Sequence, residues 1–181
     1  MNAYRVQMAE SVYIDNITNI TPTKVIISSA DILGCNALQE LTSTFTDFEF
    51  DECTYDGDEF RKFFSANSRI ETLKISNMRL ENGIVEGLRD LLKTNKVIRS
   101  LTLENIEGRC IIGERLAEGI STNESIESIS ISITDPPADA KTDSFPMPLL
   151  EVDALIKAFH ENDHIKSMRI LSKKEDIHLT K

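Results

Sequence analysis

The chain has 181 residues, which fits one domain of ordinary size or a short array of repeats. Its 30 acidic and 20 basic residues give a net charge of −10, which argues against nucleic acid or an anionic membrane as a partner, because both attract basic surfaces. Apolar residues make up 40% of the chain, too many for a disordered protein, and no apolar run approaches the roughly 18 residues of a membrane span.

The beginning of the chain carries no sign of secretion. Residues 1–14 lack a continuous apolar stretch, so no signal peptide is indicated, and three scattered cysteines are too few for a disulfide framework. We therefore predict a cytoplasmic, intracellular protein. Residues 1–21 are expected either to supply a capping strand, since residues 12–17 alternate between apolar and polar, or to stay partly disordered.

The chain contains an internal repeat. Residues 70–97 and 98–125 align without a gap, and each unit has 28 residues. Further units open at Phe45, Ile126 and Ile165, with a weaker start near Pro22. We therefore interpret residues 1–181 as a single domain with about six repeat units over residues 22–171, a Pro-rich insertion at 135–148 and a C-terminal tail at 172–181.

Each unit opens with a strand pattern, apolar-x-x-apolar-x-apolar, whose last positions alternate with polar residues as in a half-buried strand. Its members are Phe45, Phe48, Phe50; Ile70, Leu73, Ile75; Ile98, Leu101, Leu103; Ile126, Ile129, Ile131; and Ile165, Met168, Ile170.

A helical pattern precedes each strand. Apolar residues four apart form one stripe, namely Phe60 and Phe64, Leu88 and Leu92, Leu116 and Ile120, and Leu155 and Phe159. Three residues before each of the last four strands stands an asparagine: Asn67, Asn95, Asn123 and Asn162. We predict that each asparagine ends its helix in the left-handed conformation, which asparagine tolerates.

One helix and one strand per 28 residues cannot bury their own apolar faces, whereas stacked units can. We therefore predict an α/β right-handed solenoid with a parallel sheet on the concave side and helices on the convex side. A doubly wound sheet is disfavoured, because it has no fixed period and normally carries a Gly-rich first turn.

The units resemble leucine-rich repeats of the ribonuclease-inhibitor type, and the resemblance covers about residues 45–171. The segments LLKTNKVIRSLTLEN and ISTNESIESISIS are also similar to the repeat domain of tropomodulins, the actin pointed-end caps. The family usually has Asn or Cys eight residues after the strand start, bonding the backbone between repeats. Only the first of the positions Cys53, Met78, Ile106, Thr134 and Lys173 fits that pattern.

In solenoids of this kind the polar strand positions face solvent and usually bind the partner. They are Asp47, Glu49, Asp51, Thr72, Lys74, Ser76, Ser100, Thr102, Glu104, Ser128, Ser130, Ser132, Ser167 and Arg169. The competing interpretation is that they are only solvated strand residues. Seven acids and no base between Asp47 and Glu59 suit a protein partner with a basic surface, or else form a solvated edge that discourages stacking.

Other clusters point to no chemistry. The segment DECTYDGDE does not meet the spacing of a calcium loop, His160 and His164 flank a predicted helix end, and the cysteines lack C-x-x-C spacing. We expect no catalytic, cofactor or metal residues. The insertion at 135–148 either carries specific contacts or is a tolerated surface loop.

The leading hypothesis is a non-catalytic module that binds another protein through the concave face and the acidic N-terminal end. Narrower alternatives are an actin- or cytoskeleton-associated protein similar to tropomodulin, and an adaptor or effector of the ubiquitin system. An enzyme built on the acidic cluster with Cys53 is disfavoured, because repeat sheets usually expose a shallow groove. The sequence does not identify the partner or the oligomeric state.

Overall fold

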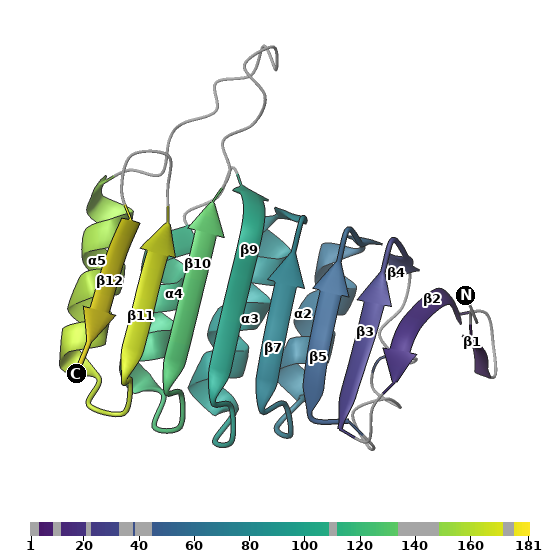
Figure 1. Ribbon diagram of the computed structural model, residues 1–181, viewed down its shortest axis with the longest axis horizontal. Helices are drawn as coiled ribbons and strands as arrows, with labels where there is room; N and C mark the ends of the chain where they lie inside the picture. The colour runs from purple at the N-terminus through teal and green to yellow at the C-terminus, as the bar shows by residue number, and fades with distance from the viewer. Residues whose placement is uncertain are drawn as a thin grey trace, which may run out of the picture.

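A computed structural model describes residues 4–8, 12–20, 23–32, 38, 45–108, 112–133, 149–171 and 176–181. It shows a mixed α/β fold with one open, mostly parallel sheet (Figure 1). Within the described residues, four helices cover one face of this sheet: α2 (Gly57–Ala66), α3 (Asn82–Thr94), α4 (Ile112–Thr122) and α5 (Leu149–Glu161).

The strands of the large sheet lie in chain order from one edge to the other. They are β1 (Tyr4–Met8), β2 (Val12–Ile20), β3 (Lys24–Ser28), β5 (Asp47–Asp51), β7 (Thr72–Ser76), β9 (Ser100–Gly108), β10 (Ser128–Ile133), β11 (Ser167–Leu171) and β12 (Asp176–Thr180). From β3 to β11 the strands of this sheet run parallel to one another. Three short strands lie beside this path: β4 (Asp31–Ile32), which pairs with β6 (Thr54–Tyr55), and β8 (Arg79–Leu80), which pairs with β9.

The register of the parallel strands follows the repeat. Leu73 lies beside Leu101, and Leu101 lies beside Ile129, which in turn lies beside Met168. Equivalent residues of successive units are therefore neighbours in space, as the aligned sequence predicts. This confirms the strand positions and the helix–strand alternation over the described units.

The core lies between the sheet and the helices. All the strand positions of the apolar pattern are buried, and so are the eight residues of the helical stripe. The phenylalanines Phe48, Phe50, Phe60 and Phe63 pack edge to face at the N-terminal end of this layer. Burial of large side chains on one face of each element is the main stabilising term of such a fold.

Antiparallel strands lie at both edges of the sheet. Strand β2 contains the alternating residues 12–17 and pairs with β3, while β1 pairs with β2. At the other edge, β12 occupies half of the predicted tail and pairs with β11. Its Ile177 and Leu179 are half-buried and pack against the core. The tail thus covers apolar surface of the last parallel strand.

The predicted left-handed helix ends are wrong, although their positions are right. Each of the four helices ends one residue before its asparagine. Asn67 has φ −107° and ψ 102°, and Asn95 has φ −75° and ψ 126°, so both are extended. The physical reason is that the asparagine side chains bond the backbone of their own and neighbouring units, which an extended backbone at the helix end allows.

Candidate binding face

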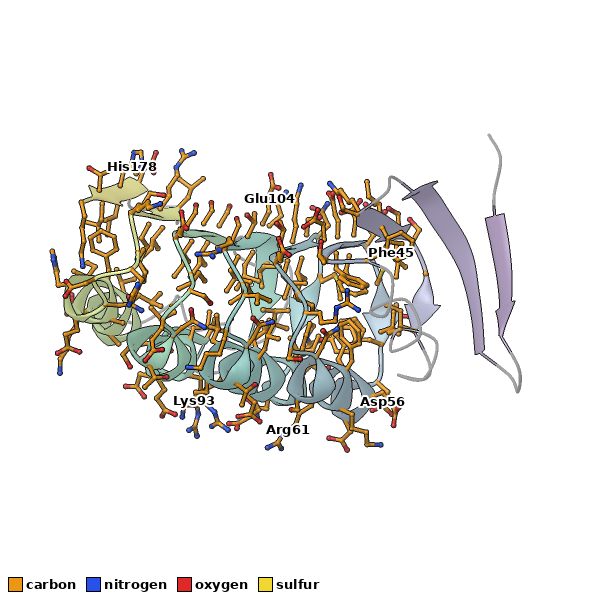
Figure 2. All side chains as sticks on the ribbon, turned by 90° about the horizontal axis from the view of Figure 1, so that it is seen from below. Phe45, Asp56, Arg61, Lys93, Glu104 and His178 are labelled. Carbon is orange, nitrogen blue, oxygen red and sulfur yellow. The ribbon has the colours of Figure 1, made fainter. Side chains whose placement is uncertain are left out.

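The face of the sheet opposite the helices presents three rows of side chains. Figure 2 shows Glu104 and His178 on this side and Arg61 and Lys93 on the helix side. Because strand side chains alternate, every strand of the large sheet from β3 to β12 contributes one side chain to each row. The strands are in register except between β9 and β10, where the register shifts after Ile131, in the third row. We call this surface the open face. Its rows are Lys24, Asp47, Thr72, Ser100, Ser128, Ser167, Thr180; Ile26, Glu49, Lys74, Thr102, Ser130, Arg169, His178; and Ser28, Asp51, Ser76, Glu104, Ser132, Leu171, Asp176.

All fourteen predicted site residues lie in these rows. Thirteen of them are exposed or half-buried, but Ser76 is only 4% exposed. Its hydroxyl donates to Oδ1 of Asp51 at 2.8 Å. Ser76 therefore supports its neighbour and offers little surface to a partner.

Ion pairs neutralise the acidic end of the open face. Glu49 lies 2.7 Å from Lys24 and 3.2 Å from Lys74, and Lys74 also lies 3.0 Å from Glu104. Burial alone would raise the pKa of Glu49, but the hydrogen bonds and charges of both lysines outweigh it and hold that pKa below its ordinary value. The pKa of Lys74 is raised, chiefly by its hydrogen bond to Glu104.

Asp51 is also satisfied within the protein. Its Oδ1 accepts hydrogen bonds from Oγ of Ser76 at 2.8 Å and from Nδ2 of Asn77 at 2.7 Å. Glu49 has its ion pairs and Asp51 has these hydrogen bonds. Among the acidic residues of β5, Asp47 therefore has the fewest described contacts that offset its negative charge. A partner with a basic surface therefore finds less free negative charge here than the sequence indicates.

A platform of uncharged hydroxyl groups covers the middle of the open face. Five half-buried residues from β9, β10 and β11 form its centre: Ser100, Thr102, Ser128, Ser130 and Ser167. Oγ of Ser167 donates to Oγ of Ser128 at 3.3 Å. Each hydroxyl can donate and accept hydrogen bonds, so the platform can bind polar groups of a partner without requiring charge.

The C-terminal end of the open face carries a bidentate ion pair. Nε and Nη2 of Arg169 donate to the two carboxylate oxygens of Asp176 at 3.1 and 3.0 Å. The bond lowers the pKa of Asp176. Asp176 and His178 are part of this end because β12 pairs with β11. The sequence prediction missed both residues, although the alternation in residues 176–180 is a strand signal.

Asparagine side chains join successive units on the inner edge of the helices. Each amide oxygen accepts from backbone N–H groups just before the strand that follows it. The Nδ2 groups of Asn95, Asn123 and Asn162 donate to backbone carbonyls about one repeat earlier in the chain, whereas Nδ2 of Asn67 has no partner among the described residues. The donor contacts are Asn95 to Asn67 and Ile70, Asn123 to Leu92 and Asn95, and Asn162 to Ile120 and Asn123. We call this series the asparagine ladder. It fixes the spacing of the units and hence the geometry of the open face.

Lys181 makes the corresponding contact to the last unit of the asparagine ladder. Its Nζ donates to the carbonyl of Asn162 at 2.7 Å and lies 3.7 Å from a carboxylate oxygen of Asp163. The same ammonium group lies 5.1 Å from the ring centre of Phe159.

A second series of contacts lies where the parallel strands end. Ser29, Glu52, Asn77 and Asn105 occupy equivalent positions and all have positive φ near 50°. Nδ2 of Asn105 donates to Oδ1 of Asn77 at 3.0 Å. The next position contains Cys53, whose Sγ lies 3.4 Å from the carbonyl of Ile27 in the neighbouring unit. This contact agrees with the inter-repeat role that the family resemblance implies for Cys53.

Several expectations concern residues outside those that the structure describes. They include the insertion at 135–148, Cys35, Cys110, Thr134 and Lys173. In the described part, His160 and His164 are exposed, and α5 ends between them. The described residues contain no group of three or more His, Cys, Asp or Glu side chains that could hold a metal ion.

Comparison with known proteins does not assign the open face. No protein-family description matches the chain, and no curated protein matches it. Among the helices that the structure describes, none is both long and apolar enough to cross a membrane.

Proposed function

We propose that the chain is a leucine-rich-repeat solenoid of the ribonuclease-inhibitor type and that it binds another protein through the open face without catalysis. The observation that carries this proposal is the side-chain lattice of the open face, in which seven strands contribute three rows with a single register shift, between β9 and β10. The asparagine ladder supports the solenoid interpretation, because Nδ2 of Asn95, Asn123 and Asn162 each donates to the carbonyl of the preceding ladder asparagine.

The platform of hydroxyl groups is the part of the open face best suited to a partner. Its serines and threonines are half-buried, and their backbones are fixed in the middle of the sheet. Little conformational entropy is lost when such a surface is bound, which favours affinity from a modest number of hydrogen bonds. The flanking charges of Lys74 and Arg169 already have carboxylate partners. The expected partner surface is therefore polar and close to neutral where it meets the platform.

Reversing the charge of all the acidic residues of β5 would not be a clean test of the expected basic partner. Changing Glu49 to Lys would break two ion pairs and place the new charge beside Lys24 and Lys74. Loss of binding in such a variant would follow from a disturbed sheet as readily as from a lost contact. Asp47→Asn changes charge without these consequences.

Affinity purification from native lysate tests the proposal. The wild-type chain is compared with Ser130→Arg, which places a long cation at the centre of the platform, and with Thr122→Arg, a matched change on the exposed end of α4. We expect the same protein to be captured by the wild type and by Thr122→Arg but not by Ser130→Arg. Equal capture by both variants would contradict binding at the platform.

The narrower alternatives, an actin-associated protein and an adaptor or effector of the ubiquitin system, remain predictions, because no contact among the described residues bears on either. An intracellular location is also part of the proposal. It is supported by the sequence, in which three scattered cysteines are too few for a disulfide framework.

A further inference from the structure

Two adjoining hollows are lined by residues that follow β5 and β7 and by Asn105 of β9. Their volumes are 790 and 630 Å³, and they share Tyr55, Arg79 and Glu81. We call the two together the rim groove. It lies beside the open face and is lined by other residues, so binding in the rim groove does not depend on the proposed function of the open face.

The floor of the rim groove is apolar and fixed in place. Cys53, Met78 and Leu80 are between 1% and 6% exposed. The hydroxyl of Tyr55 donates to the carbonyl of Arg79 and accepts from the backbone N–H of Glu81 at 3.2 Å. The three buried residues offer little surface themselves, but the half-buried ring of Tyr55 is held in place by these bonds. This ring is the part of the floor on which a long aliphatic side chain can lie.

The walls of the rim groove carry carboxylates without a cationic partner. Glu52 and Glu81 are exposed and line the larger hollow, and Asp58 lines the smaller one. Within the described part of the chain, none of the three forms an ion pair, and Glu52 accepts only a hydroxyl contact from Ser29. Arg79 is the single cation among the described residues that line either hollow.

We propose that the rim groove binds a segment of another protein that presents a lysine or arginine side chain. The aliphatic stem packs on the apolar floor, and the charged end lies between Glu52 and Glu81. Charge complementarity selects a basic segment, because the walls hold more carboxylates than cations. Arg79 opposes the incoming cation, so it limits the affinity of the rim groove.

The test uses a fluorescein-labelled peptide of alternating lysine and alanine, and fluorescence anisotropy measures its affinity for the full chain. The groove variant is Glu52→Gln with Glu81→Gln. The matched control is Glu71→Gln with Asp153→Asn, which removes the same charge from exposed positions elsewhere. A third variant, Arg79→Gln, removes the opposing cation.

We expect the groove variant to weaken binding about three- to tenfold and the control less than about twofold. Arg79→Gln should tighten binding about two- to fivefold, a change that a damaged fold cannot produce. If the groove variant and the control weaken binding equally, the peptide is attracted only by the net negative charge of the protein, and the proposal is overturned. An unchanged affinity in the groove variant, or no binding by the wild type, would also overturn it.

Discussion

Replacing Asn123 by alanine tests the asparagine ladder at a fully packed point. Asn123 is 1% exposed. Its Nδ2 donates to the carbonyls of Leu92 and Asn95 at 2.6 and 3.0 Å. Its Oδ1 accepts from the backbone N–H groups of Ser125 and Ile126 at 2.9 and 2.7 Å. Truncation leaves these four backbone groups without their partner inside the protein.

The size of the effect depends on these contacts. A buried backbone group that loses its hydrogen bond costs about 1–3 kcal/mol, and relaxation recovers part of that cost. We therefore expect Asn123→Ala to lower the free energy of unfolding by about 4 kcal/mol. Asn67 offers a matched comparison, because its Nδ2 has no hydrogen-bond partner among the described residues and its Oδ1 accepts from the N–H of Arg69. Asn67→Ala should cost only about 1 kcal/mol.

Urea unfolding followed by far-ultraviolet circular dichroism measures both values. The slope of the transition must stay equal among wild type and variants for the comparison of free energies to hold. An equal loss of stability in the two alanine variants would refute this reasoning, because the inter-unit contacts of Asn123 would then contribute nothing.

Three further substitutions test packing and burial between helices. In Gly87→Ala the new Cβ would lie 2.9 Å from Cα of Arg61, so the clash should cost more than the roughly 1 kcal/mol gained in helix propensity. In Gly57→Ala the new Cβ would lie 3.7 Å from its nearest atom, so this variant should be slightly more stable than the wild type. Thermal unfolding measures both changes. Burial raises the pKa of Glu151 despite its bond from the N–H of Gly113 at 3.1 Å. The folded state therefore binds the Glu151 proton more tightly than the unfolded state, so this residue makes stability fall as pH rises above the ordinary carboxyl range. In Glu151→Gln, the free energy of unfolding should therefore fall less between pH 4 and pH 7 than it does in the wild type. An unchanged difference between the two pH values would contradict this role of Glu151.

The repeat in the sequence predicts the layers of this fold well, because burial repeats with the unit. Leu73 and Leu101 are aligned in the sequence and adjacent in the sheet. The helix ends at the ladder asparagines are predicted for the same reason. The backbone conformation of these asparagines is not predicted by the sequence, since the contacts of Asn95 to the preceding unit depend on how closely two units approach.

The charge pattern of the open face illustrates the limit of sequence reasoning. In the sequence, the acidic residues between Asp47 and Glu59 have no basic residue among them and look unpaired. In the structure, Lys24 and Lys74 form ion pairs with Glu49 from the two neighbouring strands. Such pairs depend on register and side-chain reach together. The rim groove is likewise invisible in the sequence, because three strand ends and two helix starts enclose it.

Photo-crosslinking tests the central claim, binding of a protein at the open face, most directly. A photoreactive amino acid replaces Ser130 in one version of the chain and Thr122 in another, and both are irradiated in native lysate. We expect the version modified at Ser130 to form a crosslink to one protein and the version modified at Thr122 to form none to it. A crosslink to that protein only from the position of Thr122 would contradict the account.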